Sequence, residues 1–194
     1  MERLKAVIFD LDGTIVDAPY NWSRIKEELE TDGVPILSFL AGLEEPEKSK
    51  KWKLLEKYEK NATEKAVLKR GISELLTALT ERGIKKALVT NNSRKNVYFL
   101  LKKFKLQFDC VITRESGLWK PSPAPFLAVL KKMEIKREEC CVVGDSHFDI
   151  KAAERAGITK IYILSKERQI FTSSSVEVVK SVEKLGERIE ELLW

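Results

Sequence analysis

The feature that most constrains the fold of this chain is a strict alternation of helical and strand-like segments that begins at Gly71. Strand-like runs are predicted at 87–89, 110–112, 140–143 and 161–164, and a helical segment precedes each of them, at 72–81, 95–104, 123–133 and 150–156. A last strand at 176–179 and a closing amphipathic helix at 181–193 follow. Alternation of this kind is typical of a doubly wound α/β domain with a mainly parallel sheet, a Rossmann-like core.

A further strand is predicted near the N-terminus, at Ala6–Phe9, because four apolar residues run into a glycine turn. The segment 18–70 lacks strand-like runs and is predicted to be helical, with Trp22, Ile25 and Leu29 on one helix face and a longer helix opening at Pro46. We therefore expect an α/β core formed by 1–17 and 71–194, with 18–70 inserted as a small helical domain. A length of 194 residues fits one domain with an insertion.

The composition is that of a soluble globular protein, with 34% charged and 43% hydrophobic residues. The net charge is +5, but basic residues are interleaved with acidic ones, which argues against a nucleic-acid partner. No apolar stretch approaches the ~20 residues of a membrane span, and the N-terminus lacks a signal-peptide core, so we expect a cytoplasmic protein. Cys110, Cys140 and Cys141 lack metal-site spacing and are expected to be buried, reduced thiols.

The first strand ends in Asp10 and Asp12, which places two carboxylates two residues apart at the end of a buried strand. The two anions repel each other, and burial raises the free-energy cost of keeping both ionised. A hard divalent cation would offset this charge, and Mg²⁺ commonly takes one or two protein carboxylates. For this segment alone, a strand that runs into a turn at Asp12-Gly13 remains an alternative.

Three further strand ends carry polar residues. The second is followed by Thr90-Asn91-Asn92-Ser93, whose hydroxyl and amide groups and helix N-terminal N–H groups suit a phosphate. The third leads into a loop with Lys120, which is followed by Pro121 and Pro123, and the fourth ends in Asp145, with Asp149 four residues on. Each alone has an ordinary explanation as a helix cap or a surface charge. Parallel strands bring all four ends to one edge of the sheet, where ligands bind.

The residues at these four strand ends resemble, in order, the four motifs of the haloacid dehalogenase-like hydrolase superfamily. The matching segments are Asp10-Leu11-Asp12-Gly13-Thr14, Thr90-Asn91, Lys120-Pro121 and Gly144-Asp145-Ser146-His147-Phe148-Asp149. The likeness covers the chain except for the insertion. The insertion lies between the first and second motifs, where this superfamily carries its helical cap, so 18–70 looks like a somewhat short cap domain.

The resemblance implies a separate catalytic role for each of three side chains. Asp10 would be the nucleophile that attacks phosphorus and becomes an aspartyl-phosphate. Asp12 would be the general acid that protonates the leaving oxygen and then activates water. Lys120 would neutralise the charge that Asp10 and the substrate accumulate. The presence of Asp12 favours phosphoryl transfer, because family members that dehalogenate carbon lack this second aspartate.

The resemblance also implies a metal and substrate site. Mg²⁺ would be held by the Asp10 carboxylate, the Asp12 backbone carbonyl and Asp145, with Asp149 in support. Thr90 and the Asn91 backbone would bind the phosphoryl oxygens.

The leading hypothesis is a Mg²⁺-dependent phosphatase that hydrolyses the phosphate monoester of a small metabolite. A phosphomutase of the β-phosphoglucomutase kind and a non-catalytic binding or regulatory module are the alternatives. The insertion carries no motif that names the substrate, and phosphoglycolate, a sugar phosphate, a nucleotide and pyrophosphate all remain open. Trp22, Trp52 and Tyr58 are expected to form the core of the insertion rather than a stacking platform.

Overall fold

The computed structural model describes residues 3–165 and 173–193. Residues 1–17 and 68–194 form one compact unit, and residues 18–67 form a second. The sequence pattern placed the end of the insertion at residue 70, whereas the contacts divide the chain after residue 67.

The first unit is built on a six-stranded sheet whose neighbouring strands are all parallel. Its strands, in the spatial order β5-β4-β1-β6-β7-β8, are β5 (Cys110–Ile112), β4 (Lys85–Val89), β1 (Ala6–Phe9), β6 (Cys140–Gly144), β7 (Ile161–Leu164) and β8 (Val176–Val179). Phe9 of β1 lies level with Leu88 of β4 and Val143 of β6, so the three central strands end side by side. The predicted doubly wound α/β class is confirmed.

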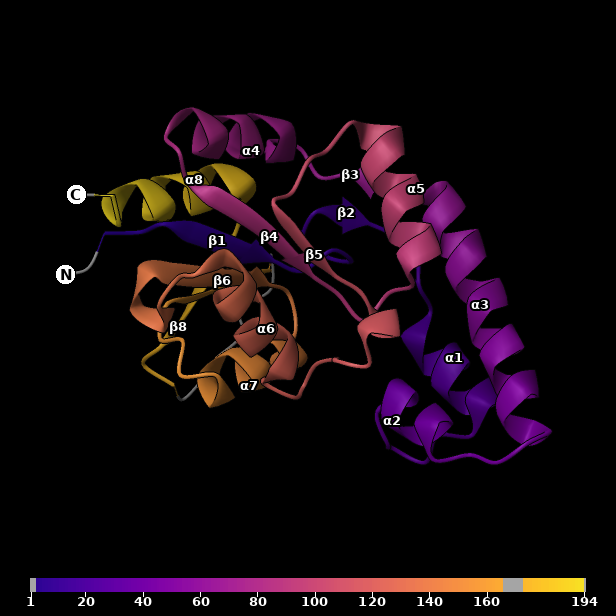
Figure 1. Ribbon diagram of the computed structural model, residues 1–194. Helices are drawn as coiled ribbons and strands as arrows, with labels where there is room; N and C mark the ends of the chain where they lie inside the picture. Colours follow the sequence, from indigo (N-terminus) through magenta and orange to yellow (C-terminus); the bar gives the residue numbers. More distant parts are fainter. Residues whose placement is uncertain (1–2, 166–172, 194) are drawn as a thin grey trace. The chain divides into compact units, whose positions relative to one another are not determined.

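Helices cover both faces of this sheet (Figure 1). On one face α4 (Ile72–Glu81) packs against α8 (Val182–Glu191), and on the other α6 (Ala124–Met133) packs against α7 (His147–Arg155). The remaining helices of this unit are α5 (Arg94–Phe104) and the short 3₁₀ turns at Arg114–Ser116 and Arg137–Glu139. The predicted elements occur in the predicted order.

The start of α7 differs from its prediction. The apolar pattern placed this start at Ile150, but the helix begins at His147. The carboxylate of Asp149, in the first turn, accepts a hydrogen bond from the backbone N–H of Ser146 and so caps the helix. A helix that begins with a polar turn has no periodic apolar residues there. The apolar pattern therefore predicts the start of the helix about one turn too far along the chain.

The core of this unit surrounds β1, whose four residues are all fully buried. Ala6 and Ile8 belong to a buried apolar cluster that includes Phe126 and Val129 of α6. Burial on both faces explains why the strand reads as a continuous apolar run rather than an alternating one. The strand is thereby a rigid support for the residues that follow it.

The three cysteines are buried free thiols, as predicted. Burial raises the pKa of Cys140 to about 12, which keeps its sulfur protonated and unreactive.

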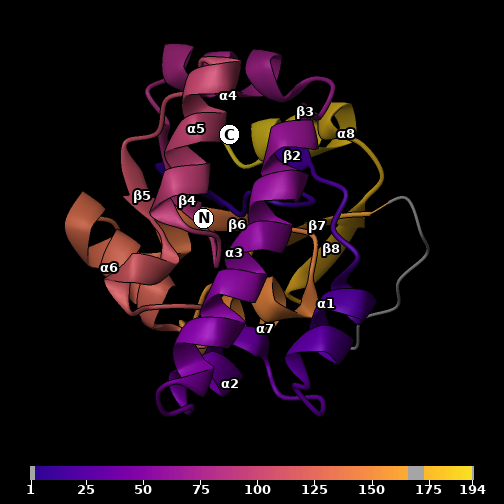
Figure 2. The ribbon, with the colours of Figure 1, turned by 90° about the vertical axis from the view of Figure 1, so that its right-hand side faces the viewer.

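The second unit consists of α1 (Trp22–Leu29), α2 (Ile36–Ala41) and α3 (Glu47–Lys65), seen together in Figure 2. The chain enters and leaves it through β2 (Val16–Asp17) and β3 (Val67–Leu68), which pair as a two-stranded sheet. Ile25 and Leu29 of α1 are buried, and α1 packs against α3. Within the described residues, no helix combines the length and apolar character that a bilayer span needs.

The prediction that Trp22 belongs to a helical core is wrong. Trp22 is 43% exposed, and its ring stacks on that of Tyr20 with centroids 4.4 Å apart. Trp22 is the first residue of α1, and helical side chains lean toward the N-terminus, so its ring lies over the preceding turn. Trp52 and Tyr58 of α3 are half-buried.

Candidate active site

The polar residues predicted at the strand ends meet at the carboxyl edge of the sheet. Asp10 follows β1, Thr90 follows β4 and Asp145 follows β6, and β1 pairs with both of the other strands. The chain crosses from β1 toward β4 on one side and from β6 toward β7 on the other. A crevice between oppositely directed connections is where ligands bind in α/β sheets.

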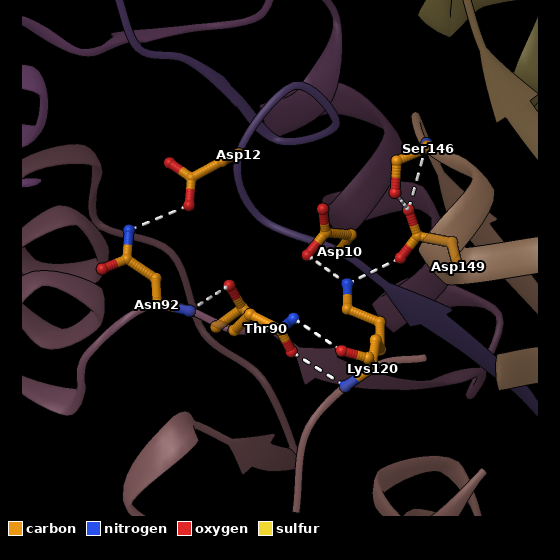
Figure 3. A network of polar contacts seen from close by, with 8 residues as sticks. Asp10, Asp12, Thr90, Asn92, Lys120, Ser146 and Asp149 are labelled. Carbon is orange, nitrogen blue, oxygen red and sulfur yellow. Dashed lines mark hydrogen bonds and ion pairs between the residues drawn. The ribbon is translucent and has the colours of Figure 1, made fainter. Parts of the chain in front are cut away.

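Lys120 contacts two carboxylates of the site, those of Asp10 and Asp149 (Figure 3). Its Nζ donates to Oδ1 of Asp10 at 2.6 Å and to Oδ1 of Asp149 at 2.6 Å. The side chains of Lys120 and Asp149 are 3% and 0% exposed, and that of Asp10 is 11% exposed. Lys120, in the loop of the third motif, is therefore a buried cation that contacts one carboxylate of the first motif and one of the fourth.

Asn91 fixes the loop that carries this lysine. Its Oδ1 accepts the backbone N–H of Lys120 at 2.9 Å, and its Nδ2 donates to the backbone carbonyl of Lys120 at 2.9 Å. The two bonds align the loop with the end of β4. The Asn91 side chain thus positions Lys120, whereas a role of the Asn91 backbone in phosphate binding stays a prediction.

Asp149 is held on both of its oxygens. Lys120 donates to Oδ1, while the backbone N–H and the hydroxyl of Ser146 donate to Oδ2 at 3.1 Å and 2.6 Å. The carboxylate packs against the backbone of Gly144, where a Cβ atom would overlap it. A Cβ atom on Gly13 would likewise overlap the carboxylate of Asp145, and Gly13 also has a φ of +82°. Neither close approach was predicted, because a contact between a glycine backbone and a carboxylate leaves no local pattern in the sequence.

Asp12 makes a different contact. Its Oδ2 accepts Nδ2 of Asn92 at 2.8 Å, and its buried Oδ1 has no hydrogen-bond partner among the described residues. Figure 3 shows Asp12 turned toward Asn92, while Asp10 is turned toward Lys120. Asn92 was missed as a site residue, and its only sequence signal is its place in the polar run that begins at Thr90.

Thr90 is 3% exposed, and its Oγ1 accepts the backbone N–H of Asn92 at 3.1 Å. Its hydroxyl proton can still be donated to an anion. The backbone N–H groups at the start of α5 were expected to be free, but two of them already donate hydrogen bonds within the protein. The backbone N–H of Arg94 donates to Glu115 at 2.9 Å, and that of Asn96 donates to the Ser93 hydroxyl at 3.3 Å.

Burial dominates the electrostatics of the carboxylates. It raises the pKa of Asp10 well above the ordinary value, against the opposing attraction of Lys120, and the charges of Asp149 and Asp145 raise it further. Burial raises the pKa of Asp12 to about 6, although the Asn92 hydrogen bond lowers it. Burial and the charge of Asp149 raise the pKa of Asp145 to about 6. Negative charge is therefore in excess at this edge.

The pKa of Lys120 lies above its ordinary value. Burial lowers it, but the charges of Asp10 and Asp149 outweigh burial and raise it. Lys120 is therefore a permanent cation at neutral pH.

The residues present fit a hard divalent cation. Asp10, Asp145 and Asp149 each offer a carboxylate oxygen, and these three atoms lie within 4.8 Å of one another. An all-oxygen donor set suits Mg²⁺, and a cation would relieve the charge excess that burial makes costly. Because both oxygens of Asp149 already accept hydrogen bonds, Asp10 and Asp145 are the better placed ligands.

The chain is also similar to a known protein family and to individual proteins. The model of the haloacid dehalogenase-like hydrolase family matches residues 23–163. A phosphorylated carbohydrates phosphatase of Thermotoga maritima is 28% identical over 212 residues, covering 94% of this chain and 97% of that protein. A pyrophosphatase of Anoxybacillus flavithermus is 29% identical over 178 residues, covering 80% of this chain and 81% of that protein. The crystal structure of a hydrolase from Pseudomonas syringae has a TM-score of 0.77 and 25% identity, and covers 96% of this chain and 98% of that one.

Proposed function

This chain belongs to the haloacid dehalogenase-like hydrolase family, and on that premise we propose that it is a Mg²⁺-dependent phosphatase. Its substrate would be the phosphate monoester of a small metabolite, and its intermediate an aspartyl-phosphate on Asp10. The observation that carries the proposal is the buried contact of Lys120 with Asp10 and Asp149, beside a second aspartate, Asp12, that makes no bond to this lysine. Two aspartates in different environments suit two different chemical roles.

In the first step, a carboxylate oxygen of Asp10 forms a bond to phosphorus while the bond from phosphorus to the leaving oxygen breaks. Asp12 gives its proton to that oxygen, so the product leaves as a neutral alcohol. Lys120 is already charged and already in contact with Asp10, so it stabilises the added negative charge without reorganising. The Thr90 hydroxyl is available to donate to a phosphoryl oxygen.

In the second step, Asp12 is a carboxylate and accepts a proton from water. The water oxygen bonds to phosphorus, the bond from phosphorus to Asp10 breaks, and inorganic phosphate leaves. Asp10 and the protonated form of Asp12 are restored, which closes the cycle.

Asp10, Asp145 and the backbone carbonyl of Asp12 would hold the Mg²⁺ ion, and Asp149 would support them through Ser146 and Lys120. When bound, the ion supplies positive charge that offsets the repulsion between the carboxylates and an incoming phosphate. The raised pKa values of Asp10 and Asp145 support this assignment, because burial and the neighbouring carboxylates disfavour the charged forms and a cation would favour them.

The named relatives support a small phosphorylated substrate, since one is a phosphatase of phosphorylated carbohydrates and another a pyrophosphatase. We assign the second unit, residues 18–67, the role of a cap that selects the leaving group and excludes bulk water. A phosphomutase shares the same catalytic side chains and remains the second candidate.

The test is phosphate release from small phosphorylated metabolites, pyrophosphate and p-nitrophenyl phosphate, with Mg²⁺ and with a chelator. Release that requires Mg²⁺ and is lost in Asp10→Asn supports the proposal and excludes a non-catalytic module. Conversion of a hexose 1-phosphate to its isomer without matching phosphate release contradicts the hydrolase and supports the mutase.

A further inference from the structure

We propose that Asn92 is a positioning residue that directs the acid proton of Asp12 to Oδ1, the oxygen that would face the leaving group. The inference rests on the proposed function and deepens it, because it assigns distinct tasks to the two oxygens of Asp12. Asn92 is 4% exposed and lies 80 residues from Asp12 along the chain.

The orientation of the Asn92 amide is fixed by its neighbours. Its Oδ1 accepts the backbone N–H of Ser93 at 2.7 Å and Nδ2 of Asn96 at 3.1 Å. A backbone N–H can only donate, so the atom that it contacts must be the amide oxygen. The amide nitrogen of Asn92 is therefore the atom turned toward Asp12.

This orientation determines what Asp12 can do with each oxygen. Nδ2 of Asn92 donates to Oδ2 of Asp12 at 2.8 Å, so Oδ2 serves as an acceptor. In the acid form of a carboxyl group, the proton then belongs on the other oxygen. That oxygen, Oδ1, is buried and accepts no hydrogen bond from the described residues. No group among the described residues therefore competes for a proton on this oxygen.

The backbone of Asn92 adds a second constraint. Its N–H donates to the Thr90 hydroxyl at 3.1 Å, and its carbonyl accepts the backbone N–H of Arg114 at 3.2 Å. The residue is held at both backbone atoms and at the amide oxygen. It can therefore hold Asp12 in one orientation with little loss of conformational entropy on substrate binding.

The test exploits leaving groups of different basicity. Glycerol 2-phosphate has an alkyl leaving group that needs a proton, whereas p-nitrophenolate leaves without one. We compare kcat/KM, which reports transfer to Asp10, for both compounds in the parent, Asn92→Leu and Asn92→Asp, after checking folding by circular dichroism. Both variants remove the donor, and the second keeps the shape of the side chain.

Loss of correctly placed acid catalysis is expected to lower kcat/KM for glycerol 2-phosphate about 10²-fold, and that for p-nitrophenyl phosphate less than about threefold. Asn96→Leu is the matched control, because it removes a donor to Asn92 but leaves the Ser93 N–H in place. It should keep the parent ratio of the two values. Equal losses for both compounds, or no loss, would overturn the inference.

Asp12→Asn separates this inference from the proposed function. If Asp12→Asn loses glycerol 2-phosphate hydrolysis selectively while the Asn92 variants do not, Asp12 is the acid and the role given to Asn92 is wrong. If Asp12→Asn keeps the parent ratio, Asp12 is not the acid, and both the proposed mechanism and this inference fail.

Discussion

At the scale of single residues, the site depends on a few buried charges whose balance is local. Lys120 is in contact with two carboxylates, and all three groups are largely removed from water. Removing one partner of a buried ion pair lowers the free energy of unfolding by more than the pair contributes, because the other charge is left buried without a partner. The same lysine is therefore expected to matter for stability as well as for chemistry.

Replacing Lys120 with Met should destabilise the protein by about 3–5 kcal/mol near pH 8, because Asp10 and Asp149 lose their shared cation. The cost should shrink toward acidic pH, because burial raises the pKa of Asp10 and a proton can then neutralise it. Urea unfolding at the two pH values measures both effects. Lys151→Met, which removes an exposed lysine of α7, is the control and should change stability by less than about 0.5 kcal/mol. Equal costs for the two variants would contradict the expectation.

The pKa values of Asp12 and Asp145, both raised to about 6, predict an unusual pH dependence. A raised folded-state pKa means that the folded protein binds the proton more tightly than the unfolded chain. The free energy of unfolding of the metal-free protein should therefore rise as pH falls through about 6, by about 1 kcal/mol per group down to pH ~5. Chelator-treated protein and its Asp145→Asn variant, unfolded with urea across this range, provide the measurement. A flat parent profile, or the same slope in the variant, would refute the assignment.

At the scale of elements, the loops after β1 and β6 are shaped by close approaches between backbone and carboxylate. A Cβ atom on Gly13 would overlap the carboxylate of Asp145, and one on Gly144 would overlap that of Asp149. Gly13 thus packs the first motif against Asp145 of the fourth, whereas the approach of Gly144 to Asp149 lies within the fourth motif.

Gly13→Ala should displace Asp145 and weaken metal binding, because the added methyl group occupies the position of its carboxylate. The increase in melting temperature caused by Mg²⁺ in the parent should largely vanish in this variant. Gly83→Ala is a matched control, since Gly83 also has a positive φ, +70°, but has no atom within 4 Å of its added Cβ. It carries the same backbone strain without the clash and should keep the Mg²⁺ response. If both variants respond to Mg²⁺ like the parent, the packing of Gly13 against Asp145 is not needed for metal binding.

The order and type of the elements were predictable from the sequence because β1 is buried on both faces and the helices carry clear apolar periods. The start of α7 was missed because its first turn is closed by Asp149, a polar contact without a period. Trp22 was misplaced because spacing alone does not tell the first turn of a helix from its middle. Periodicity therefore located the interior of elements better than their ends.

At the scale of the whole molecule, parallel strands in one sheet explain why residues from distant motifs could be grouped from the sequence. Lys120 meets Asp10 across 110 positions, and this meeting follows from strand ends that share an edge. The contact of Asn92 with Asp12 does not follow from topology, because it depends on which way one amide is turned. Topology predicts which loops meet, and the local hydrogen bonds decide which atoms do.

The division into two units makes a last prediction at this scale. The apolar cluster between the sheet and helices α6 and α7, the lysine and the carboxylates all belong to the unit formed by 1–17 and 68–194. Replacing residues 18–67 with a short Gly-Ser linker should therefore leave a protein that unfolds cooperatively and still hydrolyses p-nitrophenyl phosphate with Mg²⁺. If residues 18–67 select the leaving group, kcat/KM values across a panel of phosphorylated metabolites should converge to within about tenfold of one another. A shortened protein that folds and keeps the parent's ranking of substrates would place specificity in the α/β unit instead.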